Sequence, residues 1–215
     1  MPITDNFNRA SLGASWEAVL GPAWSLYNDT VIHVAEVVRQ DSVDYQFTAI
    51  RRTESFSGDH YAQADCEFTD DTYATNGRDG GFSSPAVRVQ SNGDCYYAEM
   101  RNGYIDVNVR SGGVSTYIGD SGLLSPTLSY NTLYTLKLVA TGSSIQLYLN
   151  GVLKATITNS TLTGGKPGLF GYAGEATQDV ALPADADNFE CTDALASETF
   201  PAGHVHSRVN TLVRM

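Results

Sequence analysis

A chain of 215 residues is long enough for one large domain or two small ones, and all-β sandwiches of this size often form a single unit. Its 20 Gly and 12 Tyr, with only 17% charged residues, favour strands and turns over helices. The formal net charge of −11 argues against nucleic acid as a partner, because phosphate binding needs clustered Lys and Arg, whereas it suits a divalent cation held among carboxylates.

The cysteines and the N-terminal stretch bear on the compartment. Cys66, Cys95 and Cys191 form an odd set without close spacing, which argues against a disulfide framework and against a zinc site. The stretch MPITDNFNRA has neither a basic region nor an apolar run, so we expect no signal peptide, and no apolar stretch is long enough for membrane insertion. We therefore expect synthesis in the cytoplasm without export.

The first part of the chain predicts four strands, near Ala23–Asn28, Val31–Ala35, Tyr45–Arg51 and His60–Thr69. In the last of these, small and apolar residues at every second position place Cys66 on a buried face, where it acts as a structural thiol. Long loops follow at Asp70–Ser84 and at Gly119–Asn131. Many short strands in one domain indicate two stacked sheets.

The stretch from Ser84 to Asp120 is divided by three turn dipeptides, Asn92-Gly93, Asn102-Gly103 and Ser111-Gly112. Asn-Gly between alternating runs is typical of a hairpin, because both residues tolerate positive φ. Taken as two-residue turns, the dipeptides predict a four-stranded antiparallel meander with the following register: Arg88 opposite Tyr97, Tyr97 opposite Asn108, and Asn108 opposite Ser115.

This register sorts the side chains of the meander into two faces. The face predicted to be buried is apolar and contains Val87, Val89, Tyr96, Ala98, Met100, Ile105, Val107, Val109, Val114, Thr116 and Ile118. The face predicted to point outward is polar and aromatic and contains Arg88, Gln90, Tyr97, Glu99, Arg101, Tyr104, Asp106, Asn108, Arg110, Ser115 and Tyr117.

A second pair of hairpins is predicted between Thr132 and Thr158. A two-residue turn at Asn150-Gly151 would place Leu147 opposite Lys154. A three-residue loop beginning at Leu149 keeps the apolar residues of both strands on one face, and we prefer it.

The tripeptide Asp-Asn-Phe occurs near both ends, in ITDNFNR at Ile3–Arg9 and in DADNFECTD at Asp185–Asp193. No other part of the first half recurs in the second, so duplication does not explain it. We interpret it as the mark of adjacent first and last strands, with Phe7 and Phe189 in equivalent core positions. The domain then comprises residues 1–191.

Four stretches carry a resemblance to a known family: DNFNRASLGASWEAVLGPAWSLYND, TLKLVATGSSIQLYLNGVLKATITN, GGKPGLFGY and DADNFE. Together they resemble the concanavalin A-like, LamG-type jelly-roll domains over roughly Ile3–Cys191. The resemblance implies an all-β fold of two antiparallel sheets in a jelly-roll β-sandwich. Many members bind glycans, several hold a structural Ca²⁺, some are glycoside hydrolases, and others are attachment or decoration modules on secreted proteins and phage particles.

The outward face of the meander is the candidate glycan-binding surface. Sugars suit it because their C–H faces stack on aromatic rings and their hydroxyls need fixed donors and acceptors. The candidate residues are Arg88, Tyr97, Tyr104, Asp106, Asn108 and Tyr117. The alternatives are an ordinary polar sheet face and a face covered by a neighbouring subunit.

A glycoside hydrolase needs two carboxylates that flank the scissile bond. The hydrolase signature of the family, Glu-x-Asp-x-x-Glu on one strand, is absent from this sequence. Glu99 and Asp106 come opposite each other as a candidate acid–base pair. Neutralisation by Arg88, Arg101 and Arg110 on a solvated face explains them as well, and we predict that the chain is not an enzyme.

A Ca²⁺ site is conceivable where the terminal strands meet. Asp5 and Asp187 approach each other if those strands pair, and Asp185 lies beside them, so the three are candidate ligands. No spacing in the chain matches a known Ca²⁺ loop, and solvated acidic loops account for the same carboxylates.

After Cys191 the alternation of the sequence ends, and residues 192–215 close on the apolar-spaced VNTLV. Composition is typical of a flexible terminus. Because a lone domain does not need such a segment, we interpret it as an assembly arm anchored by Phe200, Val209, Leu212 and Val213, which contacts other copies or other virion proteins.

These observations favour a non-enzymatic structural or surface-display protein, most plausibly a bacteriophage virion component such as a capsid decoration or tail protein that also adheres to cell-surface glycans. A soluble glycan-binding lectin is the alternative, and a glycoside hydrolase is the third interpretation.

Overall fold

The computed structural model describes residues 1–9, 11–21, 25–27, 31–33, 47–69, 81–172 and 185–194, with the backbone alone for 25–27 and 31–33. Within these ranges the chain forms strands, turns and loops and no helix. No helix of the described residues is therefore long and apolar enough to cross a membrane.

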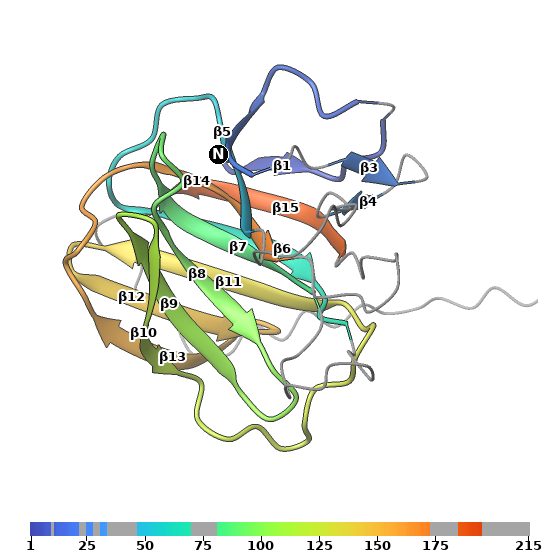
Figure 1. The fold of residues 1–215 in the computed structure, drawn as a ribbon, viewed down its shortest axis with the longest axis vertical. Coiled ribbons are helices and arrows are strands. Elements are labelled where there is room, and N and C mark those ends of the chain that lie inside the picture. Colours follow the sequence, from blue (N-terminus) through green and yellow to red (C-terminus); the bar gives the residue numbers. More distant parts are fainter. Residues whose placement is uncertain are drawn as a thin grey trace, which may run out of the picture.

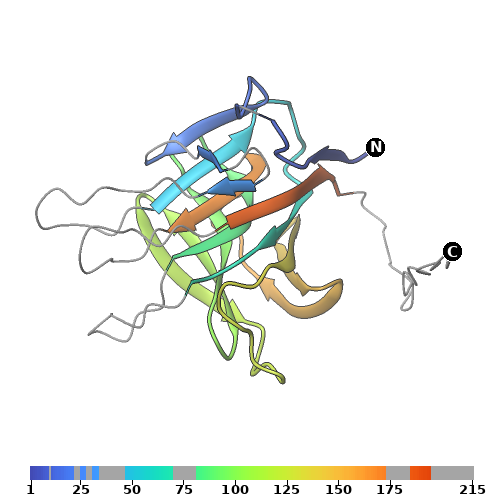
Figure 2. The same cartoon turned by 90° about the vertical axis from the view of Figure 1, so that its right-hand side faces the viewer.

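The described strands form two antiparallel sheets that pack face to face (Figures 1 and 2). The eight-stranded sheet contains β1 (Ile3–Asp5), β3 (Ser25–Tyr27), β4 (Val31–His33), β6 (His60–Cys66), β11 (Tyr134–Thr141), β12 (Ser144–Leu149), β13 (Val152–Thr158) and β15 (Asp185–Asp193). Its order is β13-β12-β11-β6-β15-β4-β3, and β1 pairs with β15.

The seven-stranded sheet contains β2 (Trp16–Leu20), β5 (Phe47–Arg52), β7 (Phe82–Val89), β8 (Cys95–Met100), β9 (Ile105–Ser111), β10 (Val114–Asp120) and β14 (Lys166–Tyr172). Its order is β10-β9-β8-β7-β14-β5-β2. The predicted all-β, two-sheet antiparallel sandwich is confirmed.

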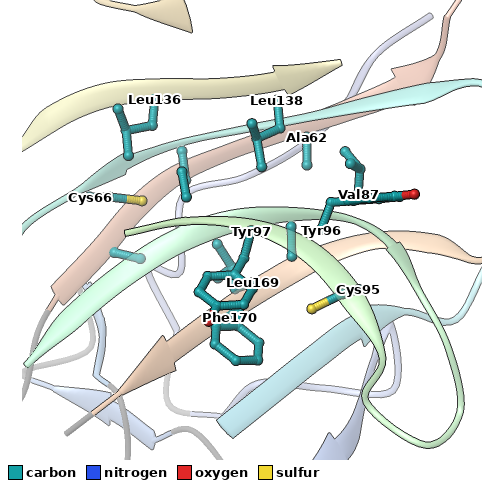
Figure 3. Close-up of a cluster of buried hydrophobic side chains, with 14 of the residues drawn as sticks. Ala62, Cys66, Val87, Cys95, Tyr96, Tyr97, Leu136, Leu138, Leu169 and Phe170 are labelled. Atoms are coloured by element: carbon teal, nitrogen blue, oxygen red, sulfur yellow. The ribbon is translucent and has the colours of Figure 1, made fainter. Parts of the chain in front are cut away.

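The core lies between the two sheets (Figure 3). Alternate residues of β6 are buried, which brings Ala62 and Cys66 inward beside Leu138 of β11. Val87 and Tyr96 of the seven-stranded sheet are also fully buried. Burial raises the pKa of the Cys66 thiol, so Cys66 is a buried, free, structural cysteine as predicted.

The first and last described strands are adjacent, as predicted from the repeated Asp-Asn-Phe, but Phe7 follows the end of β1 and is not in a strand position equivalent to that of Phe189. Asp5 of β1 lies opposite Phe189 of β15, and Phe7 and Phe189 are both fully buried. Their ring centroids lie 5.7 and 4.8 Å from that of Trp16, so one indole packs against both phenylalanines. The two ends of the described sandwich are thus joined by one aromatic cluster.

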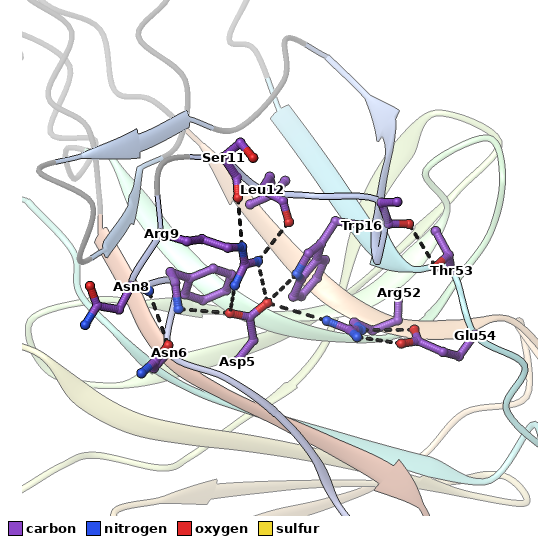
Figure 4. Close-up of polar contacts among 12 residues, drawn as sticks. Asp5, Asn6, Asn8, Arg9, Ser11, Leu12, Trp16, Arg52, Thr53 and Glu54 are labelled. Carbon is purple, nitrogen blue, oxygen red and sulfur yellow. Dashed lines mark hydrogen bonds and ion pairs between the residues drawn. The ribbon is translucent and has the colours of Figure 1, made fainter.

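Asp5 organises a polar network beside that cluster (Figure 4). Its carboxylate accepts hydrogen bonds from the Phe7 amide at 2.9 Å, the Trp16 indole at 2.8 Å and the Arg9 guanidinium at 2.5 and 2.7 Å. The buried Arg52 lies 3.5 Å from it. Burial by itself would raise the pKa of Asp5, but the bonds from Arg9, Trp16 and Phe7 lower it below the usual value.

The β8–β9 hairpin has the predicted register: Arg101 donates its amide to Tyr104, and Tyr97 lies opposite Asn108. The β9–β10 turn is at Gly112-Gly113, both with positive φ, and not at Ser111-Gly112. Tyr117 rather than Ser115 therefore lies opposite Asn108, but a shift of two residues keeps each side chain on its predicted face.

Two residues of the predicted buried face are exposed. Val114 and Thr116 belong to β10, which is the edge strand of the seven-stranded sheet, and Val114 is 64% exposed. The alternation of apolar residues correctly gave the direction of these side chains, but it could not reveal that the opposite sheet does not reach over them.

The predicted position of Arg88 opposite Tyr97 is wrong, because Ala86 occupies it. Arg88 has φ 55° and shifts the register of β7, and its amide donates to Nε2 of the buried His60 at 2.9 Å. Its guanidinium is buried and donates to the carbonyls of Gly58, Leu162 and Gly142. Arg88 therefore ties loops together and is not part of the outward face.

The preferred three-residue loop between β12 and β13 is also wrong. Asn150 and Gly151, both with positive φ, form a two-residue turn that places Leu149 opposite Val152. A bulge then shifts the register so that Leu147 pairs with Ala155. The bulge places Leu147, Ala155 and Ile157 on one face, as predicted, whereas Leu153 lies opposite Tyr148 and is 47% exposed.

Replacement of Asp5 by Ala is expected to lower the free energy of unfolding by about 3 kcal/mol, because the buried Trp16 indole would lose its acceptor and the buried Arg52 would keep only Glu54 of its two carboxylate partners. Urea denaturation measures this change. Glu17→Ala is the matched control, since Glu17 pairs with Arg51 at 3.0 Å but is half exposed, and its removal should cost less than about 1 kcal/mol. Equal losses in the two variants would contradict the role given to Asp5.

Candidate functional site

The outward side of β8, β9 and β10, at the free end of the seven-stranded sheet, gathers the polar and aromatic candidates (Figure 1). Two rows of directly opposite residues cross these strands. One row is Tyr97, Asn108 and Tyr117, and the other is Glu99, Asp106 and Asp120. We call these six residues, with Arg101 and Tyr104 at the adjoining hairpin, the outer face.

The aromatic residues of the outer face differ in exposure. Tyr97 is 1% exposed and its ring is stacked on Phe170, with centroids 4.0 Å apart (Figure 3). Tyr104 is 41% and Tyr117 is 54% exposed. Tyr97 is therefore a packing residue beneath the surface, whereas Tyr104 and Tyr117 present ring faces to solvent.

Tyr117 is held in place by a carboxylate. Its hydroxyl donates to Oδ2 of Asp120 at 2.5 Å, and the other oxygen of Asp120 accepts the Gly122 amide at 2.8 Å. The bond to Asp120 raises the pKa of Tyr117 to about 12 and lowers the pKa of Asp120. The ring is thus oriented beside an ionised carboxylate.

Arg101 bridges the two carboxylates that the sequence placed opposite each other. Its Nη2 lies 2.9 Å from Oε1 of Glu99, and its Nε lies 2.9 Å from Oδ2 of Asp106. Burial raises the pKa of Asp106, and Arg101 opposes that rise. Of the three arginines proposed to neutralise this pair, only Arg101 contacts both members in the described bonds, since Arg110 pairs with Asp94 at 3.1 Å.

Asn108 is the unusual polar group of the outer face. It is 6% exposed, and its Nδ2 has no hydrogen-bond partner among the residues that the structure describes. Buried amide groups are normally paired, because an unmade hydrogen bond costs about 1–3 kcal/mol. Asn108 is therefore a side chain of the outer face whose hydrogen bonding the described residues leave incomplete.

The same sheet face continues into a purely aromatic region. Phe47, Phe82, Phe170 and Tyr172 lie with ring centroids 5.4 to 6.4 Å apart, next to Tyr97. Sequence reasoning did not assign this region to the site, nor did it include Glu99, Arg101 and Asp120 among the site residues. The position of Asp120 opposite Asp106 can be predicted once the Gly112-Gly113 turn is recognised. The aromatic region depends on the pairing of β14 with β7, which no local sequence pattern reveals.

Asp5, Asp185 and Asp187 do not come together as a cation site. The oxygens of Asp5 are occupied by Arg9, Trp16 and the Phe7 amide. Asp187 lies opposite Asp65, and burial together with the charge of Asp65 raises its pKa. Among the described residues no group of three acidic, histidine or cysteine side chains is arranged to hold a metal ion.

A hollow beside β1 and β15, away from the outer face, has a volume of about 730 Å³. Its lining is polar and includes Thr4, Asn6, Ser15, Gln63 and Asn188. The charged groups at its edge, Asp5, Arg9 and Arg52, are bonded to one another. This hollow offers hydrogen-bonding groups without exposed aromatic rings, and it is the weaker candidate for ligand binding.

The proposed assembly arm, with Phe200, Val209, Leu212 and Val213, lies outside the described residues. The boundary predicted at Cys191 falls within β15, which pairs with β6 as far as Asp193.

No protein-family model matches the sequence, and no curated protein matches it. Solved structures match its fold. The carbohydrate-binding module CBM66 from Bacillus subtilis has a TM-score of 0.59 at 20% identity, over 85% of this chain and 98% of that chain. A β-1,3-1,4-glucanase from a mouse hindgut metagenome has a TM-score of 0.60 at 9% identity, over 90% and 99%. The Crh5 transglycosylase has a TM-score of 0.59 at 14% identity, over 90% and 85%.

The chain thus shares the two-sheet jelly-roll fold of these structures, which is the fold that the sequence resemblance implied. This fold carries both carbohydrate-binding modules and enzymes that act on glycosides. The prediction that the chain is not an enzyme is therefore wrong, because the fold does not exclude enzymatic activity. Two of the three structures named are enzymes with the same fold. The absence of one signature also does not exclude another arrangement of catalytic carboxylates.

Replacement of Asn108 by Leu is expected to leave the free energy of unfolding unchanged or to raise it by about 1 kcal/mol, because Leu has a similar volume and removes an unpaired buried donor. Chemical denaturation measures the change. The control is Asn150→Leu, which should destabilise, since the Asn150 side chain accepts the Thr135 amide at 3.1 Å and its backbone has φ 49°. A clear loss of stability in Asn108→Leu would show that this amide is structurally paired.

Proposed function

We propose that the chain binds carbohydrate on the outer face. The observation that carries this proposal is the combination of two exposed tyrosines, Tyr117 on β10 and Tyr104 just before β9, with the buried Asn108 amide donor that has no partner among the described residues. The jelly-roll fold supports it, because a carbohydrate-binding module and glycoside-active enzymes use the same architecture.

The groups of the outer face suit the chemistry of a sugar ring. The exposed faces of Tyr104 and Tyr117 can stack on the apolar C–H face of the ring. Carboxylates such as Asp106 and Asp120 accept hydrogen bonds from hydroxyl groups, and the Asn108 amide donates to a ring or hydroxyl oxygen. Few, well-placed polar groups around aromatic surface are typical of small-ligand sites.

Of the residues predicted from sequence, this proposal keeps Tyr104, Asp106, Asn108 and Tyr117 as ligand-contacting groups. Tyr97 supports them from below through its stack on Phe170. Arg88 is left out because its guanidinium is buried among the carbonyls of other loops.

The biological setting remains a prediction from the sequence. A soluble lectin and a phage virion component that displays this domain through residues 192–215 both agree with carbohydrate binding. The structures named above are a carbohydrate-binding module, a transglycosylase and a glucanase, and the arm lies outside the described residues.

Hydrolysis of a glycosidic bond is the second candidate function. The observation that favours it is the directly opposite pair Glu99 and Asp106, since side chains so placed have Cβ atoms about 4.5–5.5 Å apart. The raised pKa of Asp106 suits a proton donor to the leaving oxygen, and Glu99 would serve as the second carboxylate. The bridge from Arg101 works against this role, because it stabilises both charged forms.

Tyr104→Ala and Tyr117→Ala are each expected to weaken binding of a glycan identified on an array by about threefold to tenfold, because each removes one exposed stacking surface. Titration calorimetry measures the affinity, and thermal unfolding checks that the fold is intact. Tyr148→Ala, on the opposite sheet, is the control and should leave affinity unchanged. An array without a hit, or equal losses in all three variants, would overturn the proposal.

If the chain hydrolyses glycans, Glu99→Gln and Asp106→Asn should each reduce the release of reducing sugar by about a hundredfold or more, because each removes an acid or base that acts in the transition state. Glu17→Gln, at the far edge of the same sheet, is the matched control. Sugar release that persists in both site variants would exclude this pair as the catalytic groups.

A further inference from the structure

Negative charge dominates the outer face. Glu99, Asp106 and Asp120 lie directly opposite one another on three adjacent strands. Within the described contacts, Arg101 is the cation bound to this row, through Glu99 and Asp106. Among the described contacts, this row of three carboxylates thus has the Arg101 guanidinium as its bound cation.

The neighbouring cation does not change this balance. Arg110, further along β9, lies 3.1 Å from Asp94, whose carboxylate also accepts the Gly112 amide at 2.9 Å. Arg110 and Asp94 thus form a pair of their own. Asp120 in turn stays ionised, because the Tyr117 hydroxyl and the Gly122 amide hold its pKa below the usual value.

A second observation, on the neighbouring row of the same face, points to a ligand beside these carboxylates. Asn108 lies two residues from Asp106 on β9 and on the same side of the sheet, and its buried Nδ2 has no partner. An acidic row alone would be explained as a solvated surface. An unpaired buried donor beside it calls for an acceptor oxygen that the described chain does not supply.

We propose that the outer face selects sugars by charge: it prefers basic amino sugars to neutral sugars and rejects acidic sugars such as uronates. This inference rests on the proposed carbohydrate-binding function and narrows its ligand class. Glu99, Asp106 and Asp120 are the specificity-determining residues, and Asn108 and the two exposed tyrosines bind all sugars alike.

Electrostatics gives the size of the effect. One contact between opposite unit charges at about 4 Å in a water-like medium strengthens binding about fivefold, and more where the groups are partly buried. An ammonium group that approaches Asp120 or Glu99 gains this attraction, whereas a sugar carboxylate meets repulsion. The expected preference for an amino sugar over an acidic sugar is therefore about tenfold or more at low salt.

The test uses the full chain on a glycan array that carries amino, neutral and acidic oligosaccharides, followed by affinity measurements on matched pairs. The pairs are a glucosamine oligomer with its N-acetylated form and a galacturonate oligomer with its methyl ester, because the members of each pair differ in charge on a common backbone. The measurements are repeated at ionic strengths of about 0.01 M and 1 M, where the screening length falls from about 30 to about 3 Å.

We expect the charged amino member and the neutral ester to bind more tightly within their pairs, with a preference that shrinks at high salt. Asp120→Asn and Glu99→Gln should each reduce that preference severalfold. Asp120 is exposed, so its variant carries little risk of unfolding, and Glu17→Gln is the control that should leave the preference intact.

Three outcomes decide the matter. The inference is supported if the chain binds the amino and neutral members more tightly and if Asp120→Asn and Glu99→Gln reduce this preference. Equal or tighter binding of the acidic members overturns it while carbohydrate binding stands. An array on which no glycan binds overturns the proposed function, and the charge selection with it.

Discussion

Burial of Val107 and Val109 between the two sheets fixes which side chains of β9 point outward. In a strand with alternating directions, a slip of one residue would expose both valines at about 2 kcal/mol each and would turn Asp106 and Asn108 into the core. The inner face therefore holds the outer face in register. The neighbouring strands follow by antiparallel pairing, which sets Tyr97 and Tyr117 on either side of Asn108.

The terminal strands complete the scaffold by a different means. β1 has only three residues, and its pairing with β15 is reinforced by Asp5, which joins Arg9, Arg52 and the Trp16 indole in a mostly buried network. Buried charges depend on their partners, and removal of Asp5 would leave the Trp16 indole without its acceptor and Arg52 with Glu54 alone. This network explains why Asp5 is a structural residue and not a cation ligand.

The sequence predicted the fold and the face of most side chains, because turn dipeptides and period-two alternation are local signals. It failed at bulges. The register change at Arg88 depends on a bond to His60 from another strand, and the bulge in β13 compensates for a turn that the local pattern permits in two forms. For the site, the sequence did not reveal which side chains are exposed. Tyr97 and Tyr117 look equivalent in sequence, but Tyr97 is buried and stacks on Phe170. That contact joins β8 to β14, which are separated in the sheet by β7.

Amide hydrogen exchange with and without the tightest-binding oligosaccharide tests most directly whether the outer face is the binding site. The account predicts slower exchange on ligand addition at residues 101–108 and 114–122, in the β8–β9 hairpin, β9 and β10. Protection confined to residues 4–15 and 188–190, around the hollow beside β1 and β15, would contradict the account and would place the binding site at that hollow.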